Sequence, residues 1–205
     1  MSISPDEITA VILAGGRGER MGGMDKGMLI LHEKPLVQHV IDAIEPHVQE
    51  ILLNANRHLD YYRGLGYPVV EDILGDYFGP LVGMATGMQS AATPLLVSVP
   101  CDSPFIPSHL VATLYRAMSE SDAEISVAHD GTRLQPVYAL LRCRLLPDLL
   151  VVNGGKGQLN VALEVLDEYT LRWKTINPWG SFPSGLLCLT LDSQWRCALH
   201  LTSFG

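Results

Sequence analysis

The chain has 205 residues, of which 18% are charged and 47% hydrophobic, and its formal net charge is −8. This length and hydrophobicity predict one large domain, or one domain with an appendage, and argue against general disorder. The negative charge argues against a broad nucleic-acid-binding surface, which needs a basic stripe.

The first predicted element is a buried strand at Ile8–Leu13, which leads into a glycine-rich loop. The elements predicted after the loop are a helix with Leu36, Val40, Ile44 and Val48 on one face, strands at Glu50–Asn56 and Tyr67–Val70, a helix at Pro80–Ala91, a strand at Leu95–Val99, a helix from Pro107 to about Ser119, and strands at Glu124–His129 and Gln135–Leu141. Repeated strand–helix units predict an α/β fold with a doubly wound, mostly parallel sheet. The last two strands flank a turn at Asp130-Gly131 and predict a short antiparallel element.

The glycine-rich loop lies within residues 11–31 (VILAGGRGERMGGMDKGMLIL), and residues 15–26 combine five glycines with three cations, among them Arg20 and Lys26. Glycines let backbone N–H groups approach a phosphate, and cations neutralise its charge. The spacing is not that of a P-loop, because Met24 stands in place of the lysine, nor of a dinucleotide fingerprint, because Met21 replaces the last glycine. We therefore predict a different phosphate-binding loop; the alternative is a flexible turn that carries cations.

Polar or glycine residues follow the ends of four predicted strands, namely Gly15, Asn54, Asp72 and Asp102. In doubly wound sheets the ligand crevice lies beyond the carboxyl ends of the strands, so these positions should meet at one rim. Asp102 can hold Mg²⁺ when phosphates supply the other ligands; alternatively it forms an Asx-turn or caps the next helix, before Ser108. Asn54 and Asn56 either cap a helix or contact a base or ribose, and Asp72 contacts the nucleoside or is an ordinary loop acid.

Patterns typical of several other classes are missing from the sequence. The seven histidines form no HxxxH or triad grouping, and His129-Asp130-Gly131 is most simply a hairpin turn. The four cysteines form no CxxC pair, so neither a zinc site nor a redox motif is indicated. The N-terminus lacks a secretion signal, and no apolar run reaches the roughly 18 residues of a membrane span. We therefore expect a cytoplasmic location without nucleic-acid or membrane partners.

Five segments resemble, in order and spacing, the molybdenum cofactor guanylyltransferase family over residues 8–170: LAGGRGERMGGMDKGML, NANR, VVEDILGDYFGPLVGM, PCDSPFIP and HDGTRLQPVYALL. The wider group of sugar-phosphate nucleotidyltransferases is similar in LAGGxGxRM and a metal-binding aspartate, whereas DK, NANR and PCDxPF favour the cofactor branch. The resemblance implies a Rossmann-like nucleotidyltransferase fold. It also implies transfer of GMP from Mg²⁺-bound GTP to the terminal phosphate of molybdopterin or Mo-molybdopterin, with release of pyrophosphate.

The same resemblance implies the roles of individual residues. The residues implied to bind GTP are Leu13, Ala14, Gly15, Gly16, Lys26, Asn54, Asp72 and Asp102. Arg20, Lys26 and Asp102 would be catalytic, with Arg20 completing the phosphate cradle and Asp102 carrying Mg²⁺. An ionised phosphate oxygen attacks in this reaction, so electrostatic stabilisation and in-line positioning replace a strong base. Further partners would be molybdoenzyme chaperones, and the chain would be a monomer or weak oligomer.

The C-terminal part departs from the family pattern. Beyond Thr175 only Asp192 and Arg196 are charged, and no helical or alternating period is sustained. We expect a nucleotidyltransferase domain at residues 1–173 and an irregular tail at 174–205. Our hypothesis is an altered reading frame or a diverged, non-functional end after roughly Thr170; the alternative is a lineage-specific tail. Alternative functions are a molybdopterin cytidylyltransferase, a sugar-phosphate nucleotidyltransferase, or a non-catalytic nucleotide- or cofactor-binding protein disabled by its C-terminus.

Overall fold

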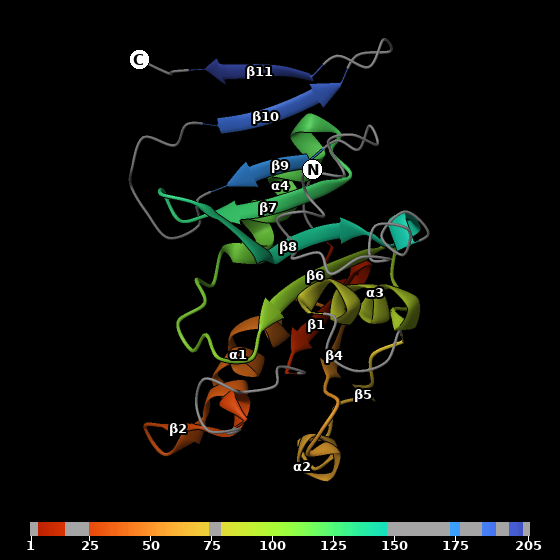
Figure 1. Ribbon diagram of the computed structural model, residues 1–205, viewed down its shortest axis with the longest axis vertical. Coiled ribbons are helices and arrows are strands. Elements are labelled where there is room, and N and C mark those ends of the chain that lie inside the picture. The colour runs from red at the N-terminus through yellow and green to blue at the C-terminus, as the bar shows by residue number, and fades with distance from the viewer. Residues whose placement is uncertain are drawn as a thin grey trace.

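The computed structural model describes residues 4–14, 25–73 and 79–146, together with three strands in the C-terminal part. Nine strands form one sheet in the order β11-β10-β9-β7-β8-β6-β1-β4-β5 (Figure 1). These strands are β1 (Ile8–Leu13), β4 (Glu50–Asn54), β5 (Val69–Val70), β6 (Leu95–Pro100), β7 (Ile125–His129), β8 (Leu134–Arg142), β9 (Trp173–Ile176), β10 (Leu186–Leu191) and β11 (Cys197–Thr202). The helices are α1 (Leu36–Ile44), α2 (Leu59–Arg63), α3 (Pro80–Ser90) and α4 (Leu110–Ser121), and β2 (Ile30–Leu31) pairs with β3 (Lys34–Pro35) in a separate hairpin.

The strand directions confirm the predicted mostly parallel α/β sheet. β1 is parallel to both β4 and β6, and β5 is parallel to β4. β8 is antiparallel to both β6 and β7, so β7 again runs in the direction of β6. The antiparallel element expected around the Asp130-Gly131 turn is therefore the β7–β8 hairpin, inserted between parallel strands.

Alternate residues of the central strands pack into two cores on opposite faces of the sheet. In β1, Ile8, Ala10 and Ile12 join the core formed with α1, α2 and α4. The side chain of Val11 points to the other face, into the core formed with α3. The central strands are buried on both faces, which is why they appear in the sequence as continuous apolar runs.

Two element boundaries differ from the predicted ones because a proline lies next to each. α1 ends at Ile44 because Pro46 lies in the 3-10 turn Glu45–His47 that follows, and a proline interior to a helix removes a hydrogen bond. Val48, predicted on the same helical face, lies beyond this turn and still packs against the core from there. The third strand is shorter than predicted and begins at Val69, directly after Pro68.

Three strands in the C-terminal part differ from the expected irregular tail. β9 pairs in parallel with β7, and β10 pairs antiparallel with β9 and β11. Of the three, only β11 lies at the edge of the sheet. Strand formation depends on neighbours in the sheet as well as on sequence period, so the sequence did not indicate these strands. The division at residue 173 and the reading-frame hypothesis both stay predictions.

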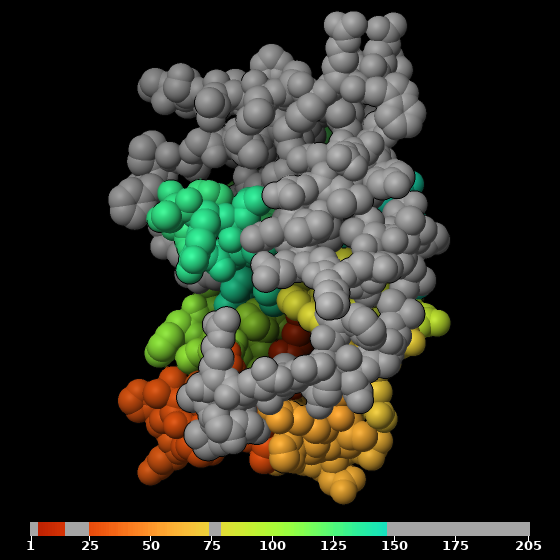
Figure 2. Space-filling model, viewed as in Figure 1, coloured from red at the N-terminus to blue at the C-terminus, as the bar shows by residue number. Residues whose placement is uncertain are grey.

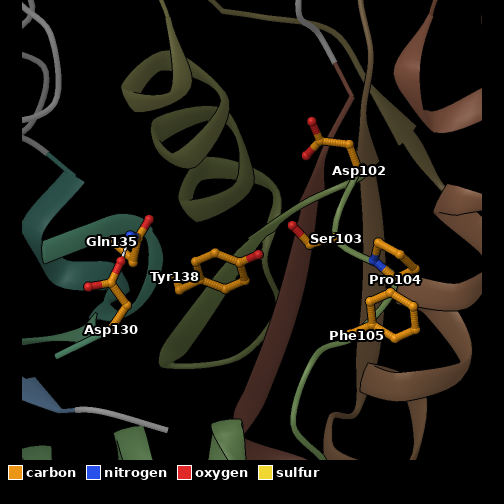
Figure 3. Close-up of a pocket in the computed structure, with 7 residues that line it drawn as sticks. All are labelled: Asp102, Ser103, Pro104, Phe105, Asp130, Gln135 and Tyr138. Atoms are coloured by element: carbon orange, nitrogen blue, oxygen red, sulfur yellow. Dashed lines mark hydrogen bonds between the residues drawn. The ribbon is translucent and has the colours of Figure 1, made fainter. Parts of the chain in front are cut away.

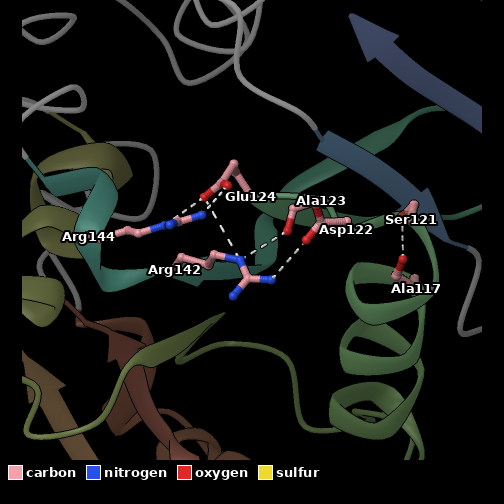
Figure 4. Close-up of polar contacts among 7 residues, drawn as sticks. All are labelled: Ala117, Ser121, Asp122, Ala123, Glu124, Arg142 and Arg144. Atoms are coloured by element: carbon pink, nitrogen blue, oxygen red, sulfur yellow. Dashed lines mark hydrogen bonds and ion pairs between the residues drawn. The ribbon is translucent and has the colours of Figure 1, made fainter. Parts of the chain in front are cut away.

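A cluster of ion pairs joins the start of β7 to the end of β8 (Figure 4). Glu124 accepts from Arg144 and lies 3.9 Å from Arg142, whose Nε also donates to the carbonyl oxygen of Ala123 at 3.3 Å. Arg142 is paired with Leu95, the first residue of β6, so the cluster lies at the amino end of that strand. Ion pairs that are partly exposed to solvent, as these are, contribute little to stability, about 0–1 kcal/mol each. We assign this cluster a structural role.

Candidate functional site

Three neighbouring strands end together at the rim that the sequence predicted. The backbone N–H of Cys101 donates to the carbonyl oxygen of Leu13 at 3.1 Å, and that of Ala14 donates to Asn54 at 2.8 Å. These bonds join the ends of β1, β4 and β6, and Asp102 lies two residues beyond the end of β6. The predicted site residues Gly15, Gly16 and Arg20 lie outside the described residues.

Lys26 and Asp102 meet at this rim although 76 residues separate them in sequence. The Nζ of Lys26 donates to Oδ2 of Asp102 at 2.7 Å, and the side chains are 48% and 30% exposed. An ion pair this exposed contributes little to folding. The capping alternative for Asp102 is wrong, because the residue preceding α4 is His109 and no side chain caps that helix. The pair therefore presents a cation and a carboxylate side by side to solvent.

Lys26 is positioned by a buried carboxylate that was not predicted from the sequence. Asp25 is 6% exposed, and its Oδ1 accepts from the hydroxyl of Tyr62 at 2.6 Å and from the N–H of Gly27 at 3.1 Å. A Cβ on Gly27 would lie 2.6 Å from the Tyr62 oxygen, so only glycine fits there. Burial, and then the bond to Asp25, raises the pKa of Tyr62, which stays a donor. Among the described residues, Oδ2 of Asp25 has no hydrogen-bond partner.

Tyr62→Phe is expected to destabilise the fold by about 1–3 kcal/mol, because the buried Asp25 carboxylate loses a donor. Tyr67→Phe is the matched control, since Tyr67 donates to the exposed Glu45 at 2.7 Å, and its cost should stay below about 1 kcal/mol. Urea unfolding of both variants measures the difference. Equal losses of stability would show that Asp25 does not depend on Tyr62.

Asn54, Asn56 and Asp72 form one hydrogen-bonded network between the ends of β4 and β5. Asn54 donates to Oδ1 of Asp72 at 2.8 Å, and Asn56 donates to Oδ2 at 2.6 Å. The N–H of Asp72 returns a bond to Asn56 at 2.9 Å. The helix-capping alternative is therefore wrong for both asparagines, since no side chain caps α2. Asp72 is likewise no solvated loop acid, because both its oxygens are bonded.

The start of α3 packs directly against this network. A Cβ on Gly83 would lie 2.4 Å from Oδ1 of Asn54 and 2.6 Å from a methyl carbon of Leu13. Only glycine lets the helix approach so closely. The side chain of Asn54, 3% exposed, is consequently fixed by both β5 and α3.

An open pocket of about 380 Å³ lies next to Asp102, on the side of β6 that faces β8 (Figure 3). It is lined by Asp102, Ser103, Pro104, Phe105, Asp130, Gln135 and Tyr138. Figure 2 shows the loop between β6 and α4 and the tip of the β7–β8 hairpin on one face of the molecule. Of these residues only Asp102 was predicted from the sequence to belong to a site. The aromatic Phe105 between two prolines in PCDSPFIP was the one local signal available.

The turn of the β7–β8 hairpin is confirmed in the form that the sequence predicted. Oδ1 of Asp130 accepts from the N–H groups of Thr132 and Arg133 at 2.8 and 2.9 Å. These two bonds lower the pKa of Asp130. Oδ2 accepts from Nε2 of Gln135 at 2.5 Å, so the turn also fixes a pocket side chain.

The carboxylates of the rim suit a metal ion only if a ligand shares its coordination. In the part of the chain that the structure describes, no three His, Cys, Asp or Glu side chains are grouped to hold a metal. Mg²⁺ nevertheless binds through one or two carboxylates when phosphates and waters complete its shell. Asp102 fits that donor set. The neighbouring Cys101 does not suit it, because burial raises the pKa of its thiol to about 12.

Sequence comparisons match this chain to a known family and to curated relatives. The family model described as MobA-like NTP transferase domain matches residues 10–169. A molybdenum cofactor guanylyltransferase of Cupriavidus necator is 43% identical over 161 residues, covering 76% of this chain and 81% of the relative. One of Shewanella loihica is 48% identical over 136 residues, covering 66% and 69%.

Solved structures share the fold. A nucleotidyl transferase from Methanothermobacter superposes with a TM-score of 0.68 at 20% identity, covering 83% of this chain and 87% of that one. The molybdopterin-guanine dinucleotide biosynthesis protein A of Archaeoglobus fulgidus gives 0.63 at 18% identity, covering 77% and 79%. At these identities the likeness concerns the fold alone. No helix among the described residues is long and apolar enough to cross a membrane.

Proposed function

The chain belongs to the MobA-like NTP transferase domain family, and on that premise we propose that it transfers GMP from GTP to the terminal phosphate of molybdopterin. The acceptor is molybdopterin itself or its molybdenum-loaded form, and the product is a guanine dinucleotide cofactor. The curated relatives that are named for this activity match the chain over most of their own length. The enzyme is accordingly a nucleotidyltransferase.

One observation carries the proposal at the level of the site, namely the Lys26–Asp102 pair at 2.7 Å. It lies at the carboxyl ends of parallel strands, where doubly wound sheets bind their ligands. A lysine neutralises a phosphate oxygen, and a carboxylate binds the cation that accompanies a nucleoside triphosphate. A lysine and a carboxylate exposed at the same point suit a triphosphate with its bound metal ion better than they suit a phosphate alone or a metal ion alone.

The reaction balances without a protein base. An ionised oxygen of the acceptor phosphate attacks the α-phosphorus of GTP and forms the new P–O bond. The bond from the α-phosphorus to the bridging oxygen breaks, and pyrophosphate leaves with that electron pair. No proton moves, so the chain's task is to bring two polyanions together and to stabilise charge on the leaving group. We propose that Lys26 performs the second task.

The nucleoside half of GTP is assigned to the β1, β4 and β5 side of the rim. Leu13 and Ala14 at the end of β1 lie beside Asn54, which is hydrogen-bonded to Asp72. Their mutual bonds hold these groups in position before a ligand arrives, which reduces the ordering cost of binding. Gly15, Gly16 and Arg20 are proposed to complete the phosphate cradle from the adjoining loop.

Nucleotidyltransferases of this family generally use a divalent metal, and we propose Mg²⁺ held by Asp102. When bound, the ion neutralises phosphate charge and stabilises the leaving pyrophosphate. We further propose a cytoplasmic location, a monomer or weak oligomer, and delivery of the product to molybdoenzyme chaperones.

The proposal is tested by incubating the protein with molybdopterin, MgCl₂ and GTP labelled at the α-phosphate. We expect label in the cofactor and release of unlabelled pyrophosphate. Label from CTP instead of GTP would indicate a cytidylyltransferase, and transfer only to a sugar phosphate would indicate the wider group. Binding of nucleotide without any product would support the non-catalytic alternative.

A further inference from the structure

We propose that the pocket beyond Asp102 binds the ring system of the acceptor, a fused nitrogen heterocycle carrying a phosphate monoester, and that Phe105 and Gln135 recognise it. The inference rests on the proposed function, because it assigns the second substrate of the same transfer. It concerns residues to which the transfer chemistry gives no role.

The position of the pocket relative to Asp102 is the first argument. In the sheet order β8-β6-β1-β4-β5, the proposed nucleotide contacts lie on the β1, β4 and β5 side of β6. The pocket is lined from the other side, by β8 and the β7–β8 hairpin, and Asp102 borders both regions. A ligand in the pocket therefore meets the triphosphate at Asp102, where the transfer takes place.

The walls of the pocket suit a heterocyclic ring system with a planar face. Phe105 is 78% exposed, the most exposed of the large hydrophobic side chains described. Aromatic faces stack favourably on other ring systems, and an apolar pocket with a few fixed polar groups is typical of small-molecule sites. Tyr138 on β8 and Ser103 on the loop that carries Phe105 both line the pocket, so its wall joins these two segments. The pocket volume of about 380 Å³ is within the ordinary range for such ligands.

Gln135 supplies the directional contact. Its Nε2 donates to Asp130 at 2.5 Å, and Asp130 is itself held by two backbone N–H groups of the turn. The amide can therefore not rotate freely, and its oxygen points away from Asp130 (Figure 3). A fixed carbonyl oxygen accepts from the N–H edge of a nitrogen heterocycle. A guanine base offers a similar edge, so the nucleotide is the competing occupant.

The test measures both substrates with Phe105→Ala and Gln135→Ala. We expect the KM for molybdopterin to rise about tenfold in each variant, which corresponds to about 1.4 kcal/mol, while the Kd for GTP stays within about twofold. The matched controls are Ile30→Ala, another exposed apolar side chain, and Gln38→Ala, whose amide donates to Asp42 at 2.8 Å on the surface. Both controls should leave the two constants unchanged.

Each other outcome overturns either the inference or the proposed function. An unchanged molybdopterin KM with normal turnover overturns the inference alone. A raised Kd for GTP would place the guanine in the pocket and also overturn it. If the wild-type protein makes no labelled product, the proposed function fails, and anaerobic calorimetric titration with molybdopterin decides the inference. Binding that Phe105→Ala weakens about tenfold supports it, and equal or absent binding overturns it.

Discussion

Asp102→Asn is expected to lower kcat for guanylyl transfer by about a thousandfold or more, because the site loses the carboxylate proposed to hold the metal. Asparagine has nearly the same shape, so the pocket and the end of β6 keep their geometry. Its amide oxygen is neutral and binds Mg²⁺ far more weakly than a carboxylate does. The loss should therefore appear in turnover and in metal affinity rather than in folding.

The control for this variant is Asp60→Asn, which removes a fully exposed carboxylate whose nearest cation is Arg63 at 3.5 Å. Urea unfolding should show a change below about 1 kcal/mol for both variants, because both ion pairs are exposed. Steady-state rates at saturating GTP over a range of MgCl₂ concentrations then isolate the catalytic effect. If Asp102→Asn keeps turnover within tenfold of the wild type, Asp102 has no metal role.

The elements that the sequence predicted well are those buried on both faces of the sheet. The strand predicted at Ile8–Leu13 is β1, and the strand predicted at Leu95–Val99 is β6 with one further residue. A parallel strand covered on both sides needs apolar residues throughout, so its extent is visible in the sequence. Ends near Pro46 and Pro68 were less predictable, because the local backbone decides them.

Only those site residues that lie at the ends of strands could be predicted from the sequence. The rule that ligands bind beyond the carboxyl ends of parallel strands brought Asn54, Asp72 and Asp102 to one rim. It could not pair Lys26 with Asp102, nor place Tyr62 on Asp25, since those contacts depend on how distant segments pack.

The pocket residues were missed for a similar reason. Gln135 lies in a strand whose pattern predicts only a hairpin, and its role depends on the Asp130 carboxylate across the turn. Phe105 lies in a loop, where an aromatic residue has no periodic pattern to join. The proposed roles depend on the exposure of the Phe105 side chain and on the orientation of the Gln135 side chain, and neither can be predicted from a sequence pattern.

Lys26→Ala is expected to raise the KM for GTP about tenfold and to lower kcat about tenfold, because a charged hydrogen bond to phosphate is lost. Lys34→Ala is the matched control, since Lys34 is similarly exposed and pairs with Asp42 on the surface. The buried bonds of Asp25 to Tyr62 and Gly27 do not involve the Lys26 side chain, so folding should be preserved. Initial rates over a range of GTP concentrations give both constants.

A double variant separates two ways in which Lys26 could act. If Lys26 only orients the Asp102 carboxylate, then adding Lys26→Ala to Asp102→Asn changes nothing further, because the group to be oriented has already gone. If Lys26 contacts the triphosphate directly, the double variant binds GTP about tenfold more weakly than Asp102→Asn alone, even without metal. The 48% exposure of the lysine leaves its ammonium group accessible to a ligand while it is paired with Asp102. We therefore expect the second result, and identical GTP affinities in the two variants would restrict Lys26 to positioning Asp102.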